Sequence, residues 1–172
     1  LFQKMLYEGV LPDNISFITF LDASTSLMRG KQVHACVLKK GPEMDIVVCN
    51  ALITMYGISS DNPENARELF DLMPERNVVS WNARIAGYVT HGQASKALHC
   101  YEEMQCEGMS VDEFTIVSIL KSCGSLEASE RGEEVYAKLI QEGFSPAENI
   151  LLGNALLDMY AKCGLLTKAK EV

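Results

Sequence analysis

The amino-acid sequence predicts an all-α fold made of repeated helical hairpins, and three observations support this fold class. Apolar residues recur at the spacing of one helix face in several stretches, for example at Trp81, Ile85 and Tyr88. Nearly half of the 172 residues are apolar, which is too many for an intrinsically disordered chain. The third observation is internal repetition, which indicates that one structural unit is used several times.

Two segments of the chain recur about 100 residues later in a similar form. The segment GKQVHACVLKKG, at Gly30–Gly41, returns as GEEVYAKLIQEG at Gly132–Gly143. The segment NALITMYG, which we expect to form the helix Asn50–Gly57, returns as NALLDMYA at Asn154–Ala161. Such self-similarity is typical of a solenoid, in which each hairpin contacts its neighbours and the stacked first helices line one concave face.

A shorter period of about 32 to 37 residues corresponds to one hairpin. It divides the chain into one continuous row of units: 1–13 (the end of a hairpin), 14–45, 46–77, 78–112, 113–149 and 150–172 (the start of a hairpin). Because the chain begins and stops inside expected helices, we expect it to be a piece of a longer protein.

Glycine and proline residues predict where several helices begin and end. Gly92, Gly108 and Gly124 each follow a helical stretch and are expected to end it. Asn62-Pro63 predicts a helix start, with Asn62 as the N-cap and Pro63 at the first helical position, where its missing N–H breaks no hydrogen bond.

The charge and cysteine patterns argue against several classes of function. The net charge of −8 gives no support to a nonspecific binder of nucleic acid or membranes, although a groove can carry its own local sign. The six cysteines contain no C-x-x-C pair, so we expect buried thiols in a reducing compartment, with neither a zinc site nor disulfides. The sequence has no H-x-E motif and no apolar run of membrane-spanning length. We therefore expect no enzyme activity, cofactor, metal or membrane partner.

Several stretches resemble pentatricopeptide repeats, which bind single-stranded RNA, more closely than tetratricopeptide repeats, which bind peptides. VVSWNARIAGY…ALHCYEEMQCEGMSVD, in residues 78–112, resembles the standard repeat of the family. NALLDMYAKCG and NALITMYG look like its short-type repeat, and EFTIVSILKSCGSL…GEEVYAKLIQEGF looks like its long-type repeat. The repeat types follow in the order end of a standard repeat, long, short, standard, long and start of a short repeat. This order resembles that of the PLS subclass of land-plant organellar proteins. The resemblance implies a right-handed superhelical solenoid located in the mitochondrion or chloroplast.

The resemblance also implies that each repeat reads one RNA base with two or three side chains. One reader is a polar residue early in the first helix, the second closes the repeat, and a branched apolar residue three positions before the first reader packs against the base. The base-reading residues are then Asn50 with Asn77, Asn82 with Asp112, and Asn154, whose closing partner is absent. The base-sandwiching residues are Val47, Val79 and Leu151.

The identity of the readers implies a pyrimidine-leaning RNA. Asn with Asp is similar to the uracil reader of the family, and Asn with Asn to a weaker pyrimidine reader. An asparagine amide suits this role because it offers both a hydrogen-bond donor and an acceptor. Taken alone, Asn82 could instead be a cap or turn residue, and Asp13 and Asp112 could be caps between repeats.

The two long-type units depart from the readable pattern. Their reader positions pair Ile18 with Asp45 and Val117 with Asn149, and an aliphatic side chain offers a base no hydrogen bond. We expect these units to be weak readers or spacers. Arg84 is another departure, because the family usually has an apolar residue there, and this side chain could reach a phosphate or be solvated.

The leading hypothesis is sequence-specific single-stranded RNA binding, with one base for each repeat. The resemblance implies a role as the targeting part of an organellar C-to-U RNA editing factor, with editing co-factors as further partners and any deaminase in a separate C-terminal domain. The alternative is a helical-repeat scaffold for protein–protein interaction, which the acidic balance favours slightly.

Overall fold

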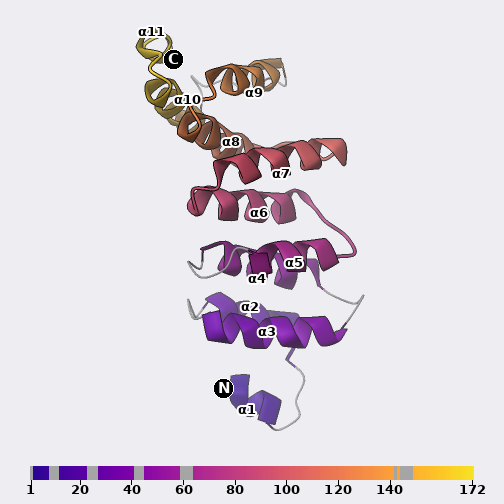
Figure 1. The fold of residues 1–172 in the computed structure, drawn as a ribbon. Helices are drawn as coiled ribbons and strands as arrows, with labels where there is room; N and C mark the ends of the chain where they lie inside the picture. The colour runs from indigo at the N-terminus through magenta and orange to yellow at the C-terminus, as the bar shows by residue number, and fades with distance from the viewer. Residues whose placement is uncertain are drawn as a thin grey trace. The chain divides into compact units, whose positions relative to one another are not determined.

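The computed structural model describes residues 2–7, 12–22, 27–40, 45–58, 64–141, 143 and 149–172, and the described part of the chain contains helices and no strand. Figure 1 shows these helices in chain order. Their bounds are α1 Phe2–Tyr7, α2 Asn14–Asp22, α3 Leu27–Lys40, α4 Ile46–Ile58, α5 Glu64–Leu72, α6 Val78–Thr90, α7 Ala94–Cys106, α8 Glu113–Ser125, α9 Ser129–Gln141, α10 Ile150–Lys162 and α11 Leu166–Ala169. The even-numbered helices from α2 onward are the first helices of the hairpins, and the helix that follows each is its second helix. The all-α prediction is confirmed.

The first helix of hairpin 46–77 begins earlier than the sequence pattern indicates. Helix α4 starts at Ile46 and not at Asn50, because Asp45 caps it. The Oδ1 atom of Asp45 accepts hydrogen bonds from the backbone N–H groups of Val47, at 2.9 Å, and Val48, at 3.1 Å. These bonds pair two of the N–H groups that a helix start leaves without a partner inside the helix.

Two of the three glycines expected to end helices do so. Gly92 and Gly108 follow α6 and α7 with φ angles of +66° and +70°, a left-handed conformation that glycine adopts without strain. The prediction for Gly124 is wrong, because this residue lies inside α8. The predicted start at Asn62–Pro63 lies outside the described residues.

The chain forms two compact units, Leu1–Gly87 and Tyr88–Val172, and each is described by itself. The largest fully buried side chains of the first unit are Phe17, Leu52, Ile53, Tyr56, Leu69, Phe70, Trp81 and Ile85. Those of the second unit include Met104, Ile119, Leu120 and Leu139, and Leu152, Leu156 and Met159 are equally buried. Both cores draw on first and second helices, as expected for hairpins that bury their apolar faces against one another.

Small residues allow close packing between helices in both units. In the first unit, a Cβ added at Gly57 of α4 would lie 2.9 Å from the Cα of Gly87 on α6, so the two backbones approach directly. In the second unit, a Cβ at Gly124 would lie 3.1 Å from the Cα of Met159 on α10. Gly124 therefore serves close approach between first helices, which explains why a glycine is placed before the end of α8.

One side-chain contact recurs in the two units and follows the internal repetition of the sequence. The thioether of Met55 on α4 packs directly over Gly30 on α3. In the second unit, the thioether of Met159 on α10 packs in the same way over Gly132 on α9. Similar sequence at an offset of about 100 residues thus produces similar packing.

All six cysteines are free thiols. Cys49, Cys100 and Cys123 are buried as expected, and burial raises the pKa of both Cys49 and Cys123 to about 11. The expectation is wrong for Cys106, which is exposed at the end of α7. No helix in the described ranges has both the length and the apolar character needed to span a membrane.

Candidate nucleic-acid interface

The residues expected to close each repeat cap the next first helix. In the first unit, Asn77 Oδ1 accepts from the backbone N–H of Ser80 at 3.0 Å and from its hydroxyl at 3.1 Å. In the second unit, Asp112 Oδ1 accepts from the backbone N–H of Thr115 at 2.9 Å and from its hydroxyl at 2.8 Å. Asn149 caps α10 in a similar way, through two backbone N–H groups. The capping role anticipated for Asp112 is therefore confirmed.

Asn50 and Asn77, the expected readers of hairpin 46–77, are directly hydrogen-bonded. Asn50 Nδ2 donates to Asn77 Oδ1 at 3.3 Å. Because this oxygen already accepts from Ser80, Asn50 must present its NH₂ group to it, which fixes the orientation of the Asn50 amide. Asn50 is only 8% exposed, and its Oδ1 atom is buried without a hydrogen-bond partner among the described residues. An unpaired buried acceptor costs about 1–3 kcal/mol, so a hydrogen bond from a bound donor would be favourable at this oxygen.

The residues expected to sandwich bases are exposed apolar side chains near the starts of their helices. Val47 is 54% exposed on α4, Val79 is 58% exposed on α6 and Leu151 is 45% exposed on α10. The equivalent positions in the long-type units, which the sequence analysis did not single out, hold Ile15 and Phe114, and both are exposed. The signal was present in the sequence as an apolar residue at the second position of each first helix. An apolar side chain that is exposed at the same position in every hairpin indicates an interaction surface.

The remaining expected readers differ in how they are placed. Asn82 is half-buried on α6 in the first unit, whereas its closing residue Asp112 belongs to the second unit. Asn154 is exposed on α10. Val117 is buried in the core of the second unit, in agreement with its expected lack of base readout.

Asp45 has a partner that the sequence analysis missed. Its Oδ2 atom accepts a hydrogen bond of 2.8 Å from Asn14 Nδ2, at the start of α2. Asn14 precedes Ile18 by four residues, so both lie on the same face of the helix, one turn apart. This spacing is the signal in the sequence that could have identified Asn14.

Arg84 packs against two aromatic rings of the first unit. Its guanidinium group lies 4.6 Å from the centre of the Phe70 ring and 5.8 Å from that of Trp81, and these rings contact each other edge to face at 4.6 Å. Cation–π contacts of this kind are worth about 0.5–2 kcal/mol, more when water is excluded. Arg84 therefore contributes to the packing of α6 on α5.

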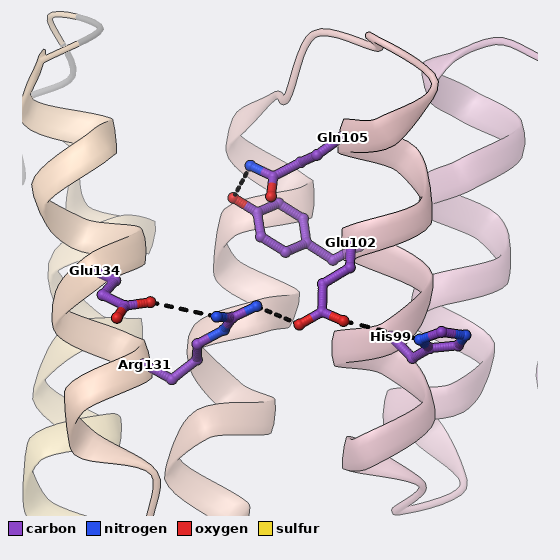
Figure 2. Close-up of polar contacts among 6 residues, drawn as sticks. His99, Glu102, Gln105, Arg131 and Glu134 are labelled. Carbon is purple, nitrogen blue, oxygen red and sulfur yellow. Dashed lines mark hydrogen bonds and ion pairs between the residues drawn. The ribbon is translucent and has the colours of Figure 1, made fainter.

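The second helices α7 and α9 are joined by an ionic contact. Figure 2 shows Arg131 of α9 between Glu102 of α7 and Glu134 of its own helix, the latter at 3.4 Å. Glu102 also lies 3.8 Å from His99. No cluster of three metal-binding side chains occurs in the ranges that the structure covers. Glu102 and Glu134 are thus surface ion-pair partners of Arg131.

Together, these features define a helical-repeat protein whose first helices carry caps, amides and exposed apolar residues at equivalent positions. A model of the PPR repeat family matches residues 76–125, and a model of the PPR repeat matches residues 47–78 and 154–172. The chain belongs to the pentatricopeptide repeat family.

Similar proteins of known sequence come from Arabidopsis thaliana. A mitochondrial pentatricopeptide repeat-containing protein is 37% identical over 175 residues, which cover 100% of this chain and 28% of that protein. The chloroplastic pentatricopeptide repeat-containing protein DOT4 is also 37% identical over 175 residues, which cover 100% of this chain and 20% of that protein. The chain therefore spans less than a third of the length of these relatives.

The fold resembles solved structures of the maize protein PPR10. The crystal structure of PPR10 matches with a TM-score of 0.73 and 24% identity, over 99% of this chain and 25% of that one. PPR10 in complex with an 18-nt psaJ RNA element matches with a TM-score of 0.71 and 23% identity, over 99% of this chain and 26% of that one. This likeness confirms the predicted class of fold, a solenoid of α-helical hairpins.

Proposed function

We propose that this chain binds single-stranded RNA with sequence preference, using one repeat for each base. The observation that carries the proposal is the Asn50–Asn77 pair. Asn77, which caps the next first helix, accepts a hydrogen bond from the Asn50 amide, and the Oδ1 atom of Asn50 has no hydrogen-bond partner among the described residues. The family membership and the RNA complex of PPR10 support the choice of ligand.

In hairpin 46–77, a pyrimidine base lies between the exposed side chains of Val47 and Val79. Asn50 Oδ1 accepts a hydrogen bond from the base, either from uracil N3–H or from the cytosine amino group. Because this oxygen is shielded from water, the amide first turns outward by rotation about its side-chain bonds and gives up its hydrogen bond to Asn77. The hydrogen bond to the base replaces the lost bond and satisfies the acceptor that is unpaired in the free chain.

The other hairpins follow the same scheme with different strength. Asn82, Val79 and Asp112 are the residues that the family pattern assigns to a uracil, and Asn154 with Leu151 begins the next site. The long-type units have no hydrogen-bonding side chain at the first reader position, which holds Ile18 in one unit and Val117 in the other. The burial of Val117 supports a spacer role for its repeat. The chain as a whole is expected to favour pyrimidine-rich RNA.

The longer protein is proposed to act in the mitochondrion or chloroplast, as the targeting part of a C-to-U RNA editing factor of the PLS subclass. The order of repeat types supports this role, and the names of the mitochondrial and chloroplastic relatives support the location. The residues described here contribute binding, and editing co-factors supply other steps.

The proposal is tested by binding of uridine-rich and purine-rich single-stranded RNA to the full-length protein in a gel-shift series. We expect tighter binding of the uridine-rich strand, with affinity that falls as salt rises. Replacing Asn82 with Thr, beside Asp112, is expected to move the preference at one base toward guanine. Ser95→Ala, at an exposed position on α7, is the matched control. Unchanged base preference in Asn82→Thr would count against the assignment of readers.

A protein-interaction scaffold is the second candidate function, and the acidic side chains of the second helices favour it. The net charge of −8 and the exposed Glu102 and Glu134 suit a basic protein partner better than a phosphate backbone. If the full-length protein binds both RNA strands equally or binds neither, this candidate is preferred.

A further inference from the structure

Hairpin 14–45 contains a polar pair similar to Asn50–Asn77, although its expected reader position holds Ile18. Asn14 Nδ2 donates to Asp45 Oδ2 at 2.8 Å, which is shorter than the 3.3 Å bond between Asn50 and Asn77. In both pairs an amide on a first helix donates to the residue that caps the next first helix. The amide of hairpin 14–45 lies one helical turn closer to the start of its helix.

The surroundings of Asn14 contain the other parts of a base-binding site. The next residue, Ile15, is 74% exposed and occupies the position equivalent to Val47 and Val79. Val47, at the start of the next first helix, is also exposed. Both residues belong to the first unit, as do Asn14 and Asp45. Hairpin 14–45 thus combines two exposed apolar residues with a preformed amide–carboxylate pair.

We propose that Asn14, held by Asp45, reads one RNA base, and that hairpin 14–45 is a base reader and not a spacer. The proposal rests on the proposed RNA-binding function and adds to it a specificity-determining residue outside the reader positions assigned from the family pattern. The base that it reads is the neighbour of the base read by Asn50.

The hydrogen bonds of Asp45 define what Asn14 offers to a ligand. Asp45 Oδ1 is used by the backbone of α4 and Oδ2 by one N–H of Asn14, so the carboxylate fixes which end of the amide faces outward. Among the described residues, the Asn14 side chain makes no other hydrogen bond. Its Oδ1 atom and its second N–H are therefore available, which matches the N3–H donor and a carbonyl acceptor of uracil.

The other long-type unit provides a natural comparison. The position equivalent to Asn14 in hairpin 113–149 holds Glu113, which has no side-chain amide. Val117 in that hairpin is buried. The exposed Phe114 can stack on a base there, but no side-chain amide selects it. We therefore expect readout in the first long-type unit and stacking without readout in the second.

The test is selection of RNA ligands from a randomised single-stranded pool by the full-length protein and by three variants. Asn14→Ala removes the proposed reader, Asn50→Ala removes the neighbouring reader, and Thr19→Ala is the control. Thr19 is exposed on the same helix as Asn14, and its hydroxyl bonds only to the backbone of Ile15, at 2.8 Å. Thermal unfolding of each variant, recorded in parallel, shows whether the fold is retained.

We expect Asn14→Ala to lose about 2- to 10-fold preference for uracil at one position, which corresponds to one net hydrogen bond, while the adjacent position keeps its preference. Asn50→Ala should give the converse pattern, and Thr19→Ala neither. If Asn50→Ala changes one preference and Asn14→Ala changes none, or weakens all sequences equally, Asn14 is only structural and the inference is wrong. If the unaltered protein selects no sequence, the proposed function itself fails.

Discussion

In two hairpins of the molecule, α4 with α5 and α8 with α9, the first helix buries more of its surface than the second. Helix α8 buries residues on most of its circumference: Thr115, Ile116, Val117, Ile119, Leu120, Ser122, Cys123 and Gly124. Its partner α9 buries Gly132, Val135 and Leu139, which form a single stripe at helical spacing. Helices α4 and α5 of the first unit show the same contrast. Helices α4 and α8 are therefore enclosed by neighbours, whereas α5 and α9 keep a broad solvent face.

The polar groups of hairpin 46–77 show a similar contrast. Helix α4 has no charged residue, and its polar contacts are caps and amides, whereas α5 carries the ion-pair partners Glu64, Arg67 and Asp71 within only nine residues. Charges are tolerated where water surrounds them and are costly where it does not. In this hairpin the charged side chains are therefore carried by the second helix, and the amides and caps by the first.

The largest effect is expected from the core of a first helix. Trp81→Ala on α6 removes a side chain that is 1% exposed and packs edge to face on Phe70, so we expect the free energy of unfolding to fall by about 3–5 kcal/mol. Leu72→Ala, at the 56% exposed end of the second helix α5, should change it by less than about 0.5 kcal/mol. Chemical denaturation measures both. Similar losses for the two variants would contradict the division between first and second helices.

The next effect concerns the caps. Asp112→Ala removes the acceptor for the Thr115 backbone N–H and should cost about 1 kcal/mol, as N-cap losses usually do. Asp112→Asn keeps an oxygen in the same place and should cost much less stability. It changes the base preference that we propose for the reader pair Asn82 and Asp112. Thermal unfolding and RNA selection on the two variants separate the cap from the reader. Equal destabilisation by Ala and Asn would argue against the capping role.

Local patterns in the sequence predicted the helices and the capping role of Asp112, because these depend on residues only a few positions apart. The base readers were assigned from the resemblance to the family, and they stay a prediction. Contacts between helices were not predictable in this way. The Asn14–Asp45 bond joins residues 31 positions apart, and the stacking of Arg84 on Phe70 depends on how α6 packs against α5. Gly124 looked like a helix end because its close approach to α10 cannot be read from its neighbours in sequence. Which helices face one another is a property of the stack, and no short motif encodes it.

A smaller effect is expected at His34, where a second helix meets a first helix. His34 Nδ1 lies 3.0 Å from the Tyr56 hydroxyl, and burial lowers the pKa of His34 below its ordinary value of 6.5, against an opposing contribution from Glu68. The unfolded chain therefore binds this proton more readily than the folded chain, and stability should decrease as pH falls below 6.5. His34→Gln should flatten this part of the curve of unfolding free energy against pH. An unchanged slope would show that His34 does not control it.

The smallest effect is expected from the ion pairs of the second helices. Arg131 contacts Glu102 across two second helices and Glu134 within its own helix, but these side chains are 39%, 47% and 64% exposed (Figure 2). Exposed pairs typically contribute roughly 0.2–1 kcal/mol, and salt screens them. Arg131→Gln should therefore cost well under 1 kcal/mol at low salt. Unfolding in urea at low salt, and again with added sodium chloride, measures the cost and its salt dependence.

The salt dependence of the loss in stability distinguishes an ion pair on a second helix from a cap on a first helix. The loss caused by Arg131→Gln should disappear at about 1 M salt, where the Debye length is roughly 3 Å, whereas the loss caused by Asp112→Ala should largely persist because a cap hydrogen bond is short and local. A double-mutant cycle with Glu102→Gln isolates the pair that joins α7 to α9. A coupling energy above about 1.5 kcal/mol that resists salt would mean that the second helices also hold neighbouring repeats together. Recognition by the first helices would then depend on an outer framework as well as on their own packing.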